Sequence, residues 1–306
     1  MDPLLKFSFA PARARGEVVK LAETWQRMIK HHQYPKAVVR LLGEMTAATA
    51  LLASNIKFDG TLTLQIHGDG PVRLLVVECQ ADLRMRATAK LVDGAAFPDE
   101  ADLTTLVNVH GRGRCVLTLD MRNRLPGQQP YQGIVPLEGH SIAQAIEAYM
   151  RNSEQLQTRL WLAADHQASC GLLLQRLPDE GGSLGAPSAA EDDDTWNRLT
   201  LLANTVTTDE LLERPPQELL HKLFWQERIS AGSLHHPRFE CTCSRQRIGR
   251  MLLSLGRPEV DSIIAELGQV AVTCDFCNAQ QRFDAVDVGE LFATGITAGA
   301  GANPQQ

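Results

Sequence analysis

Two tight pairs of cysteines near the C-terminal end constrain this chain more than any other feature. Cys241 and Cys243 lie in ECTCSRQ, and Cys274 and Cys277 lie in VTCDFCN, so the two pairs hold four of the seven cysteines. Four thiolates in two local pairs, separated by about thirty residues of structure, match the ligand set of a tetrahedral zinc site. The sequence therefore predicts one Zn²⁺ bound by these four cysteines.

The first pair leaves two points open. One residue separates Cys241 from Cys243, whereas zinc ribbons and fingers typically place about two to four residues between their cysteines. His235 and His236 are alternative ligands, although four cysteines already complete a tetrahedral shell. A purely structural role for the metal also stays open, because most four-cysteine zinc sites only hold a small fold together.

Length and composition indicate a globular chain. With 306 residues, 44% of them hydrophobic, it is long enough for two or more domains and at least one full core. The first residues, MDPLLKFSFAPARARG, lack the charged start and continuous apolar run of a signal peptide, and no apolar stretch of membrane-spanning length follows. We expect a cytoplasmic protein with no membrane partner. In a reducing compartment, paired cysteines hold metal or do redox chemistry more often than they form a permanent disulfide.

Charge is unevenly distributed along the chain. Residues 1–175 carry a net charge of +2, whereas residues 176–230 and 231–290 carry −6 and −2. A nucleic-acid-binding chain normally shows a basic stripe, and the cysteine-rich segment is mildly acidic instead. The three arginines of RQRIGR, residues 245–250, have the helical spacing that is typical of a solvated face. We therefore expect no nucleic-acid partner.

Residues 1–177 are predicted to form one mixed α+β domain with an antiparallel sheet. KAVVRLLGEMTAATALLASNI, residues 36–56, has apolar residues at helical spacing and many alanines, which indicates a core helix. Ser141 is a candidate N-cap for a second helix over 142–156. Apolar runs of strand length, bounded by turn signals, predict the strands. These runs cover residues 61–67, 72–79, 83–91, 114–121, 131–137, 158–165 and 170–177.

The other three cysteines lie within these predicted strands, at Cys79, Cys115 and Cys170. A cysteine in such a position behaves as a small apolar residue, so we expect the three thiols to be buried and inert. No serine, histidine and acidic set of a nucleophilic enzyme can be identified in this domain. The sequence therefore predicts no catalytic residue.

Residues 178–230 are predicted to be a flexible and helical linker. GGSLGAPSAAEDDD is rich in small and acidic residues, and three short helical patterns follow it over 195–206, 209–214 and 216–227. Helices this short are marginal alone in water, so they must dock on another surface. Their apolar side chains include Trp196, Leu199, Leu211, Leu212, Leu223, Phe224 and Trp225. Two interpretations explain these apolar side chains. They could form the core of an ordinary helical subdomain, or they could belong to a segment that unfolds and exposes them.

Residues 231–292 are predicted to form a small α+β zinc-binding domain. Two helical patterns, over 244–256 and 258–268, and a strand pattern over 270–274 lie between the two cysteine pairs. The last residues, 293–306, contain ITAGAGANPQQ and predict a disordered tail.

The cysteine segments resemble those of a known family. CTCSRQRIGRMLLSLG together with VTCDFCNAQQRFD resembles the C-terminal redox switch of the heat-shock protein 33 family of redox-regulated chaperones. KFDGTLTLQIHGDGPVRLLVVEC, YQGIVPLEG and SEQLQTRLWLAA look like the N-terminal core of that family, and DELLERPPQELLHKLFWQE looks like its linker. The resemblance covers most of residues 5–292. One departure is Gln281, where relatives often have tyrosine; it touches no predicted ligand but is expected to change the oxidation threshold.

The resemblance implies a role for each group of residues. Cys241, Cys243, Cys274 and Cys277 match the zinc-binding, redox-sensing cysteines of the family, which form local disulfides on oxidation, release zinc and switch on an ATP-independent holdase activity. The reduced, zinc-bound form would be inactive. The clients would be unfolding proteins, the apolar linker residues would be the candidate client-binding residues, and activation would promote homodimers. The protein would then be a stress-response chaperone and not an enzyme.

Physical estimates agree with such a switch. A structural zinc ion contributes roughly 10–16 kcal/mol in small peptides, which equals or exceeds the ~5–15 kcal/mol stability of a typical domain. Loss of zinc should therefore unfold the small domain, and we expect this to release the linker helices if that domain supplies their docking surface. Of the three disulfide connectivities, closing loops of about four residues rather than thirty-odd saves roughly 2 kcal/mol of chain entropy. This favours Cys241–Cys243 and Cys274–Cys277.

Two other classes of function stay open. A zinc-dependent nucleic-acid-binding module would bind in a salt-sensitive manner, although the acidic balance of the chain argues against it. A thiol oxidoreductase would use the CDFC pair, although that pair lacks the strand-to-helix context of a thioredoxin site.

Overall fold

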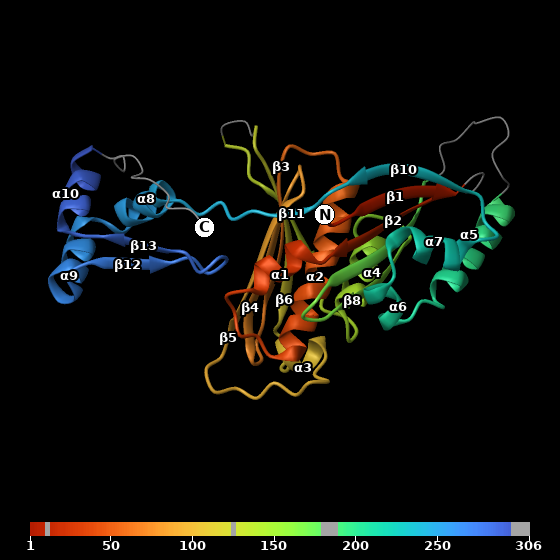
Figure 1. Cartoon of the computed structure of the whole chain (residues 1–306), viewed down its shortest axis with the longest axis horizontal. Coiled ribbons are helices and arrows are strands. Elements are labelled where there is room, and N and C mark those ends of the chain that lie inside the picture. The colour runs from red at the N-terminus through yellow and green to blue at the C-terminus, as the bar shows by residue number, and fades with distance from the viewer. Residues whose placement is uncertain (10–12, 124–126, 179–188, 295–306) are drawn as a thin grey trace. The chain divides into compact units, whose positions relative to one another are not determined.

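The structure is a computed structural model that describes residues 1–9, 13–123, 127–178 and 189–294. The chain divides into two compact units, Met1–Glu240 and Cys241–Gln306 (Figure 1). Helices and antiparallel strands are mixed in both units, so the predicted α+β fold class is confirmed. Most of the predicted flexible segment GGSLGAPSAAEDDD and of the predicted disordered tail lies outside the described residues.

Five strands form the first sheet of the N-terminal unit, in the order β10-β1-β2-β9-β8, with every neighbouring pair antiparallel. They are β1 (Leu4–Phe9), β2 (Ala14–Leu21), β8 (Thr158–Ala164), β9 (Ser169–Arg176) and β10 (Ile229–His235). The sheet therefore joins the first twenty residues of the chain to segments near positions 170 and 230.

Six strands form the second sheet, in the order β11-β5-β4-β3-β6-β7. They are β3 (Gly60–His67), β4 (Val72–Gln80), β5 (Arg84–Leu91), β6 (Arg114–Met121), β7 (Tyr131–Val135) and β11 (Arg238–Phe239). All pairs are antiparallel except the pair of β11 with β5, which is parallel and only two residues long.

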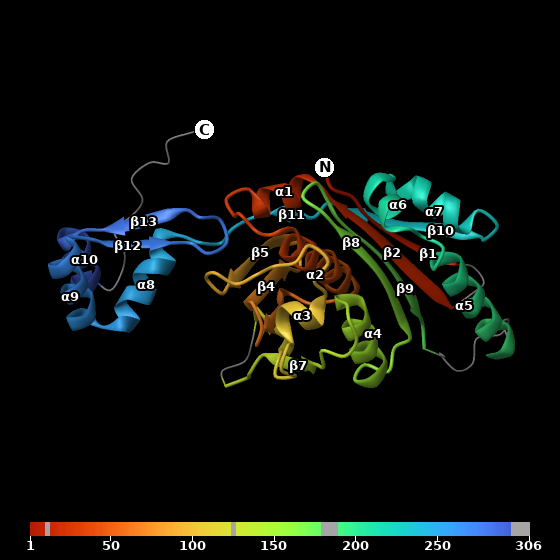
Figure 2. The ribbon, with the colours of Figure 1, turned by 90° about the horizontal axis from the view of Figure 1, so that it is seen from below.

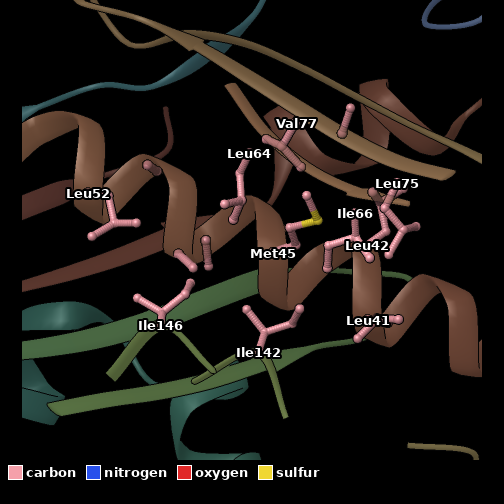
Figure 3. Packing of buried hydrophobic residues seen from close by; sticks show 14 of the residues in the cluster. Leu41, Leu42, Met45, Leu52, Leu64, Ile66, Leu75, Val77, Ile142 and Ile146 are labelled. Carbon is pink, nitrogen blue, oxygen red and sulfur yellow. The ribbon is translucent and has the colours of Figure 1, made fainter. Parts of the chain in front are cut away.

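One long helix lies between the two sheets. The first four helices are α1 (Glu23–Ile29), α2 (Lys36–Asn55), α3 (Leu103–Val107) and α4 (Ile142–Asn152). α2 packs against β2, β8 and β9 on one side and against β3, β4 and β5 on the other. Figure 3 shows its apolar side chains among those of the second sheet and α4: Leu41, Leu42, Met45, Leu52, Leu64, Ile66, Leu75, Val77, Ile142 and Ile146. α2 is the one described helix long and apolar enough to span a membrane, and it is buried in this core.

Gly43 lets α2 approach the first sheet closely. A Cβ atom at this position would collide with the Cβ atom of Ala164 in β8. The Ser169 hydroxyl of β9 donates a hydrogen bond to the Gly43 carbonyl oxygen at 2.7 Å. The glycine lowers helix propensity, but it permits a contact that any larger residue would prevent.

The core helix and the seven strands predicted between residues 36 and 177 are all present, within a few residues of the expected ends. Ser141 caps α4 as predicted, because its hydroxyl accepts a backbone N–H of the first turn. The sequence analysis missed the hairpin of β1 and β2. The inward face of this hairpin is partly ionic, since buried Glu17 pairs with Lys6 at 3.2 Å and accepts from the Ser54 hydroxyl. Apolar alternation cannot reveal such a strand.

The three linker helices dock on the N-terminal unit. They are α5 (Ala189–Ala203), α6 (Thr208–Glu213) and α7 (Pro216–Phe224). They cover the face of the first sheet that is turned away from α2, as Figure 2 shows. The ring of Phe224 lies 5.1 Å from that of Phe9, centroid to centroid. β1, β2, β8 and β9 supply their docking surface, so the condition that the zinc domain supplies it is not met.

The C-terminal unit begins later than the sequence indicates. Residues from 231 on are expected in the zinc domain, but β10 and β11 occupy 229–239 and pair with β1 and β5. These pairings join residues more than 150 positions apart, which composition and local spacing do not reveal. The two compact units divide between Glu240 and Cys241.

The C-terminal unit is a small α+β fold. It contains α8 (Arg245–Leu255), α9 (Arg257–Leu267), β12 (Val270–Thr273), β13 (Gln280–Phe283) and α10 (Ala285–Thr294). The two helices and the strand predicted between the cysteine pairs are confirmed, and α10 extends two residues into the predicted tail. Its core consists of Ile248, Leu252, Val260, Val270, Phe283, Val288 and Leu291.

Candidate metal centre

The four predicted ligands come together in the C-terminal unit. The sulfur atoms of Cys241, Cys243, Cys274 and Cys277 all lie within 4.8 Å of one another. The sulfurs of Cys241 and Cys274 are 3.7 Å apart, and those of Cys243 and Cys277 are 3.3 Å apart. Within the described ranges, this is the one group of histidine, cysteine or acidic side chains arranged to hold a metal ion.

The first pair is fixed by the start of α8. Ser244 follows Cys243 directly and caps the helix, since its hydroxyl accepts the Arg247 backbone N–H at 3.2 Å. The Arg247 guanidinium donates to the hydroxyl of Thr242, the residue between the two cysteines, at 3.0 Å. Both contacts hold the CTCS segment against the first turn of α8. The closely spaced pair therefore lies directly before the N-cap of this helix.

The second pair lies in the turn between β12 and β13. The Cys274 N–H donates to the Ala279 carbonyl oxygen, and the Asn278 N–H donates to the Cys274 carbonyl oxygen, each at 2.9 Å. Asn278 has a φ of +58°, in the left-handed region that asparagine tolerates better than most residues. The CDFC pair therefore occupies a strand-to-strand turn, whereas a thioredoxin-type site would place it at a helix start.

Burial favours the protonated form of two of the four thiols, those of Cys243 and Cys277. Burial raises the pKa of Cys243, and the neighbouring sulfurs add to this effect. Burial also raises the pKa of Cys277, although the Ala279 N–H, which donates to its sulfur, opposes the shift. Four adjacent thiolates would repel one another, so their ionisation requires a cation. Metal binding at this site would therefore release protons.

The donor set fits zinc. Zinc–sulfur bonds of about 2.3 Å in a tetrahedron place the sulfur atoms about 3.8 Å apart. The separations of the two close sulfur pairs, 3.3 and 3.7 Å, are near that spacing. Soft thiolate donors suit zinc, whereas magnesium and calcium prefer oxygen ligands. The site can therefore hold one metal ion through four sulfur ligands.

Arg245 supports the site in a way that the sequence analysis missed. Helical spacing assigns this residue to a solvated face, but its guanidinium lies 4.2 Å from the ring centroid of Phe283. It also forms an ion pair with Asp287 at 2.6 Å, and this arginine lowers the pKa of that carboxyl. Arg245 thus ties α8 to β13 and α10. No local spacing indicates contacts between these three elements.

The two alternative histidine ligands have other partners. His235 Nε2 lies 2.7 Å from the Ser233 hydroxyl, and His236 Nδ1 lies 3.3 Å from the Asp2 carbonyl oxygen. Both histidines belong to the N-terminal unit. Gln281 lies in β13 opposite Val272, and its effect on the oxidation threshold remains a prediction.

The candidate client-binding residues fall into two groups. Six belong to the apolar cluster that α5, α6 and α7 form with the first sheet, which we refer to as the linker interface. Leu199, Leu211, Leu223 and Phe224 are buried there, and Trp196 and Leu212 are partly buried. The seventh, Trp225, is 68% exposed. The structure thus brings six of the seven together and leaves Trp225 at the surface.

The remaining three cysteines are buried in β4, β6 and β9, so the predicted burial of Cys79, Cys115 and Cys170 is confirmed. Burial raises the pKa of Cys115 and of Cys170 to about 12. Their thiols stay protonated at neutral pH, which makes them poor nucleophiles.

Two sheets around a central helix, followed by a small unit with four clustered cysteines, define a two-unit protein with a candidate metal centre. A family model described as Hsp33 protein matches residues 2–284. The chain is 44% identical over 299 residues to a 33 kDa chaperonin of Methylobacillus flagellatus, covering 96% of both chains. It is 42% identical over 300 residues to a 33 kDa chaperonin of Chromobacterium violaceum, covering 98% of this chain and 96% of the relative. The chain belongs to the Hsp33 family of chaperones.

A solved structure has the same fold. The crystal structure of a 33 kDa chaperonin from Thermotoga maritima, a heat shock protein 33 homolog, matches with a TM-score of 0.76 at 18% identity. The match covers 95% of this chain and 98% of that chain. At this identity the likeness concerns the fold. The family resemblance of the cysteine and core segments is confirmed, and these relatives are named chaperonins.

Proposed function

We propose that this protein is a redox-regulated, ATP-independent holdase chaperone, switched on by oxidation of Cys241, Cys243, Cys274 and Cys277. One observation carries the proposal: these four sulfurs lie within 4.8 Å of one another in a unit whose described residues include a core of seven buried apolar side chains. So small a core provides little stability by itself. The fold of this unit therefore depends on the state of its thiols. Membership of a chaperone family supports the same function.

In the reduced state, the four cysteines hold one Zn²⁺, which supplies a crosslink between the CTC and CDFC segments. A crosslink of this kind contributes roughly 10–16 kcal/mol in small peptides, as much as the whole stability of many domains. The Ser244 cap, the Asn278 turn and Arg245 hold the two segments in place. The reduced protein keeps both units folded and is inactive.

Oxidation converts each pair of thiols to a disulfide. A thiolate attacks one oxygen of hydrogen peroxide and becomes a sulfenic acid, and the neighbouring thiol then displaces water from the sulfenic sulfur. The hydroxide expelled in the first step takes one proton from solvent, so each disulfide consumes one peroxide and yields two waters. We propose the pairs Cys241–Cys243 and Cys274–Cys277. Sulfurs bonded in this way are no longer thiolate ligands, so the metal leaves and the unit unfolds.

The chain between α7 and the first cysteine pair connects the metal centre to the linker interface. This strap, residues 225–240, contains β10, an exposed edge strand, and β11, which pairs with β5 through two residues. Few buried apolar side chains hold the strap, so it can open at a low free-energy cost. Once the C-terminal unit unfolds, the strap separates from β5 and then from β1, beginning at Glu240. The C-terminal end of α7 is then no longer held by a paired strand.

Release of the linker helices would uncover two apolar surfaces. The first is the inner face of the helices, which includes Leu199, Leu223 and Phe224. The second is the sheet face beneath them, which includes Phe9 and Leu172. Large exposed apolar patches bind other apolar surfaces, such as those of unfolding proteins. Binding of this kind needs no nucleotide.

The remaining parts of the proposal concern partners and location. We propose a cytoplasmic protein with no membrane or nucleic-acid partner, since its net charge is −6 and α2 is buried in the core. Uncovered apolar patches of two chains can cover each other, which would produce homodimers on activation. No step turns over a substrate, so the protein is not an enzyme.

The test measures zinc and chaperone activity together. Zinc is assayed with a colorimetric chelator, and aggregation of a heat-unfolded client enzyme is followed by light scattering, before and after peroxide at raised temperature. Zinc release that rises together with suppression of aggregation, both reversed by dithiothreitol and zinc, is the expected result. Zinc retained after peroxide, or released without holdase activity, would falsify the proposal. Insulin reduction is assayed in parallel, and turnover there would favour an oxidoreductase.

A further inference from the structure

A cavity of about 250 Å³ lies inside the N-terminal unit, at the C-terminal end of α2. Its walls come from both sheets, from α2 and from α4 and the residues after it. Leucines from three different elements form much of the apolar lining, among them Leu52, Leu119 and Leu173. A cavity of about 150 Å³ with such a lining can hold benzene, so this one has room for a larger apolar group.

The cavity is separate from the features already described. None of its lining residues belongs to the linker interface or to the cysteine cluster. Two of them, Ile56 and Tyr131, are 39% and 53% exposed, which places an opening to solvent beside them. A partly open apolar cavity in a folded core can admit a small molecule without any change in the linker.

Arg15 brings a positive charge into this wall. Its Nε and Nη2 donate to Gln175 Oε1 at 3.1 and 2.5 Å, and the Gln175 amide donates to the Thr158 hydroxyl at 2.9 Å. Gln175 is only 2% exposed, so the guanidinium is held in a fixed place by a buried side chain. A guanidinium has five N–H donors, and these two bonds leave three of them for another acceptor.

The charge of Arg15 is not neutralised by a close carboxylate. Among the residues that the structure describes, no carboxylate oxygen lies within ion-pair distance of this guanidinium. Glu154 also lines the cavity, but its Oε1 already accepts from the hydroxyls of Tyr131 and Tyr149 at 3.1 and 2.8 Å. An anion at Arg15 would gain charge-assisted hydrogen bonds, which are about twice as strong as neutral ones.

A second polar group in the wall also lacks a partner. The Asn55 side-chain oxygen is buried and accepts no hydrogen bond from any described residue, while its amide donates to the Leu51 carbonyl oxygen at 3.2 Å. An unpaired buried acceptor is destabilising unless a donor reaches it; an ionised carboxylate supplies none, so water is the partner that this oxygen requires. Asn55 and Arg15 are both lining residues of the same cavity.

We propose that this cavity binds a small amphiphilic carboxylate, with the carboxylate on Arg15 and an apolar chain among the leucines of the two sheets. Arg15 is the one cation among the described lining residues and selects an anionic head group. The fork of its guanidinium matches the two oxygens of a carboxylate. The apolar walls and the modest volume select an unbranched chain of medium length. A ligand there would stabilise the N-terminal unit by mass action, whatever the state of the cysteines.

The test titrates sodium decanoate into the reduced, zinc-loaded full-length protein and follows heat by calorimetry, with decan-1-ol as the uncharged comparison. We expect one decanoate per chain, bound roughly tenfold or more tightly than the alcohol, because a hydrogen bond to a charged group is worth more than a neutral one. Arg15→Met should remove this preference. Arg112→Met, which deletes an exposed arginine outside the cavity, should leave it unchanged.

Two further measurements locate the bound chain. Leu119→Phe fills part of the cavity and should weaken decanoate and decanol alike. If that variant fails to fold, nuclear Overhauser effects between the decanoate chain and the rings of Tyr131 and Tyr149 in the unmodified protein decide instead. Equal affinity of the unmodified protein for decanoate and decanol would overturn the proposal. So would unchanged decanoate binding in both Arg15→Met and Leu119→Phe, or no Overhauser effect at either ring.

Discussion

Arg84 of β5 and Glu240, the last residue before the first clustered cysteine, form an ion pair at 2.6 Å. Arg84 also pairs with Asp82 at 2.7 Å, and Asp82 pairs with Arg238 of β11 at 3.2 Å. This network of four charges fastens the end of the strap to β5. Because its members are partly exposed, solvent weakens each of these ion pairs. Such a contact can hold the strap in the reduced protein and still open after oxidation.

Loss of this network should speed activation. Arg84→Met removes two of the ion pairs without touching a cysteine, so the strap should open more often. At one fixed peroxide dose and temperature, we expect holdase activity to appear about two- to fivefold faster, because exposed ion pairs contribute only modestly to stability. Light scattering of a heat-unfolded client measures the rate.

The matched control for Arg84 is Arg122→Met. Arg122 forms an exposed ion pair with Asp59 at 3.6 Å, in the same unit but outside the strap. Its loss should leave the activation rate unchanged. Zinc content of both reduced variants should stay at one per chain. Equal activation rates for Arg84→Met and the unmodified protein would contradict the role of the strap.

Variants of two neighbouring residues, Phe224 and Trp225, should distinguish docking of the linker helices from binding of clients. Phe224 is 1% exposed and packs on Phe7 and Phe9, whereas Trp225 is largely exposed. Phe224→Ala should weaken docking by about 3–5 kcal/mol and give holdase activity without oxidant. Hydrogen exchange of α7 and client aggregation in the reduced protein measure the two effects. If Phe224→Ala needs as much peroxide as the unmodified protein, the linker interface does not hold the chaperone inactive.

Trp225→Ala is the counterpart of that variant. Since Trp225 lies at the surface, its loss should change stability by less than about 0.5 kcal/mol, and the reduced protein should stay inactive. After oxidation, however, the variant should bind an unfolded client more weakly. Fluorescence anisotropy of a labelled client measures this affinity. An unchanged client affinity would remove Trp225 from the candidate client-binding residues.

Removal of one ligand should unfold the C-terminal unit. Cys277→Ser leaves three thiolates, so we expect zinc content to fall from one per chain toward zero and the methyl resonances of Val288 and Leu291 to lose their dispersion. Cys170→Ala, which alters a buried thiol of β9, is the control and should keep its zinc. A folded C-terminal unit in metal-free Cys277→Ser would show that the seven-residue core suffices without the metal.

Disulfide mapping tests which cysteines pair on oxidation. In the folded unit, close sulfur pairs join the two segments, Cys241 to Cys274 at 3.7 Å and Cys243 to Cys277 at 3.3 Å. The two sulfurs of each local pair also lie within 4.8 Å of each other, so local pairing requires only that each sulfur turn from its nearest neighbour to the other cysteine of its own segment. The shorter loop is then favoured by chain entropy. Peptide mass spectrometry of the oxidised protein should find Cys241–Cys243 and Cys274–Cys277. Predominant pairing between the segments would contradict the local pairs.

Glu44 of α2 should make the stability of the N-terminal unit depend on pH. Burial raises the pKa of Glu44 from 4.5 to about 7, and the positive charge of Arg40 opposes this only in part. Because the folded-state pKa is the higher one, the protonated carboxyl contributes stability that is complete below about pH 4.5 and is lost as the pH rises through about 7. Glu44→Gln stays neutral, so it should be more stable than the unmodified protein at pH 8, with a difference that vanishes toward pH 4.5.

Urea denaturation midpoints across that range test the Glu44 prediction. Glu138→Gln, which neutralises an exposed carboxylate, is the matched control for the loss of one negative charge. A difference for Glu44→Gln that is constant from pH 4.5 to 8 would mean that Glu44 titrates equally in the folded and unfolded chain.

Local patterns in the sequence determined much of this protein by themselves. The α2 helix and the strands between residues 60 and 176 follow from apolar periodicity, because each has a continuous apolar face or run. The candidate metal-ligand set follows from cysteine spacing alone, since two close pairs of thiols can surround one ion wherever the chain brings them together. The structure places all four sulfurs in one group, as that spacing indicates.

Only the tertiary structure decided how these parts are connected. The β1–β2 hairpin depends on buried Glu17, a charged residue that apolar periodicity would assign to the surface. Two other features depend on residues that are distant in sequence, namely the pairing of β10 with β1 and the Arg84–Glu240 ion pair. The same is true of the docking surface of the linker helices and of the cavity around Arg15. Sequence determines which faces are apolar and which thiols are close neighbours. Which faces then meet is a matter of long-range packing, because each contact depends on the position of every other element.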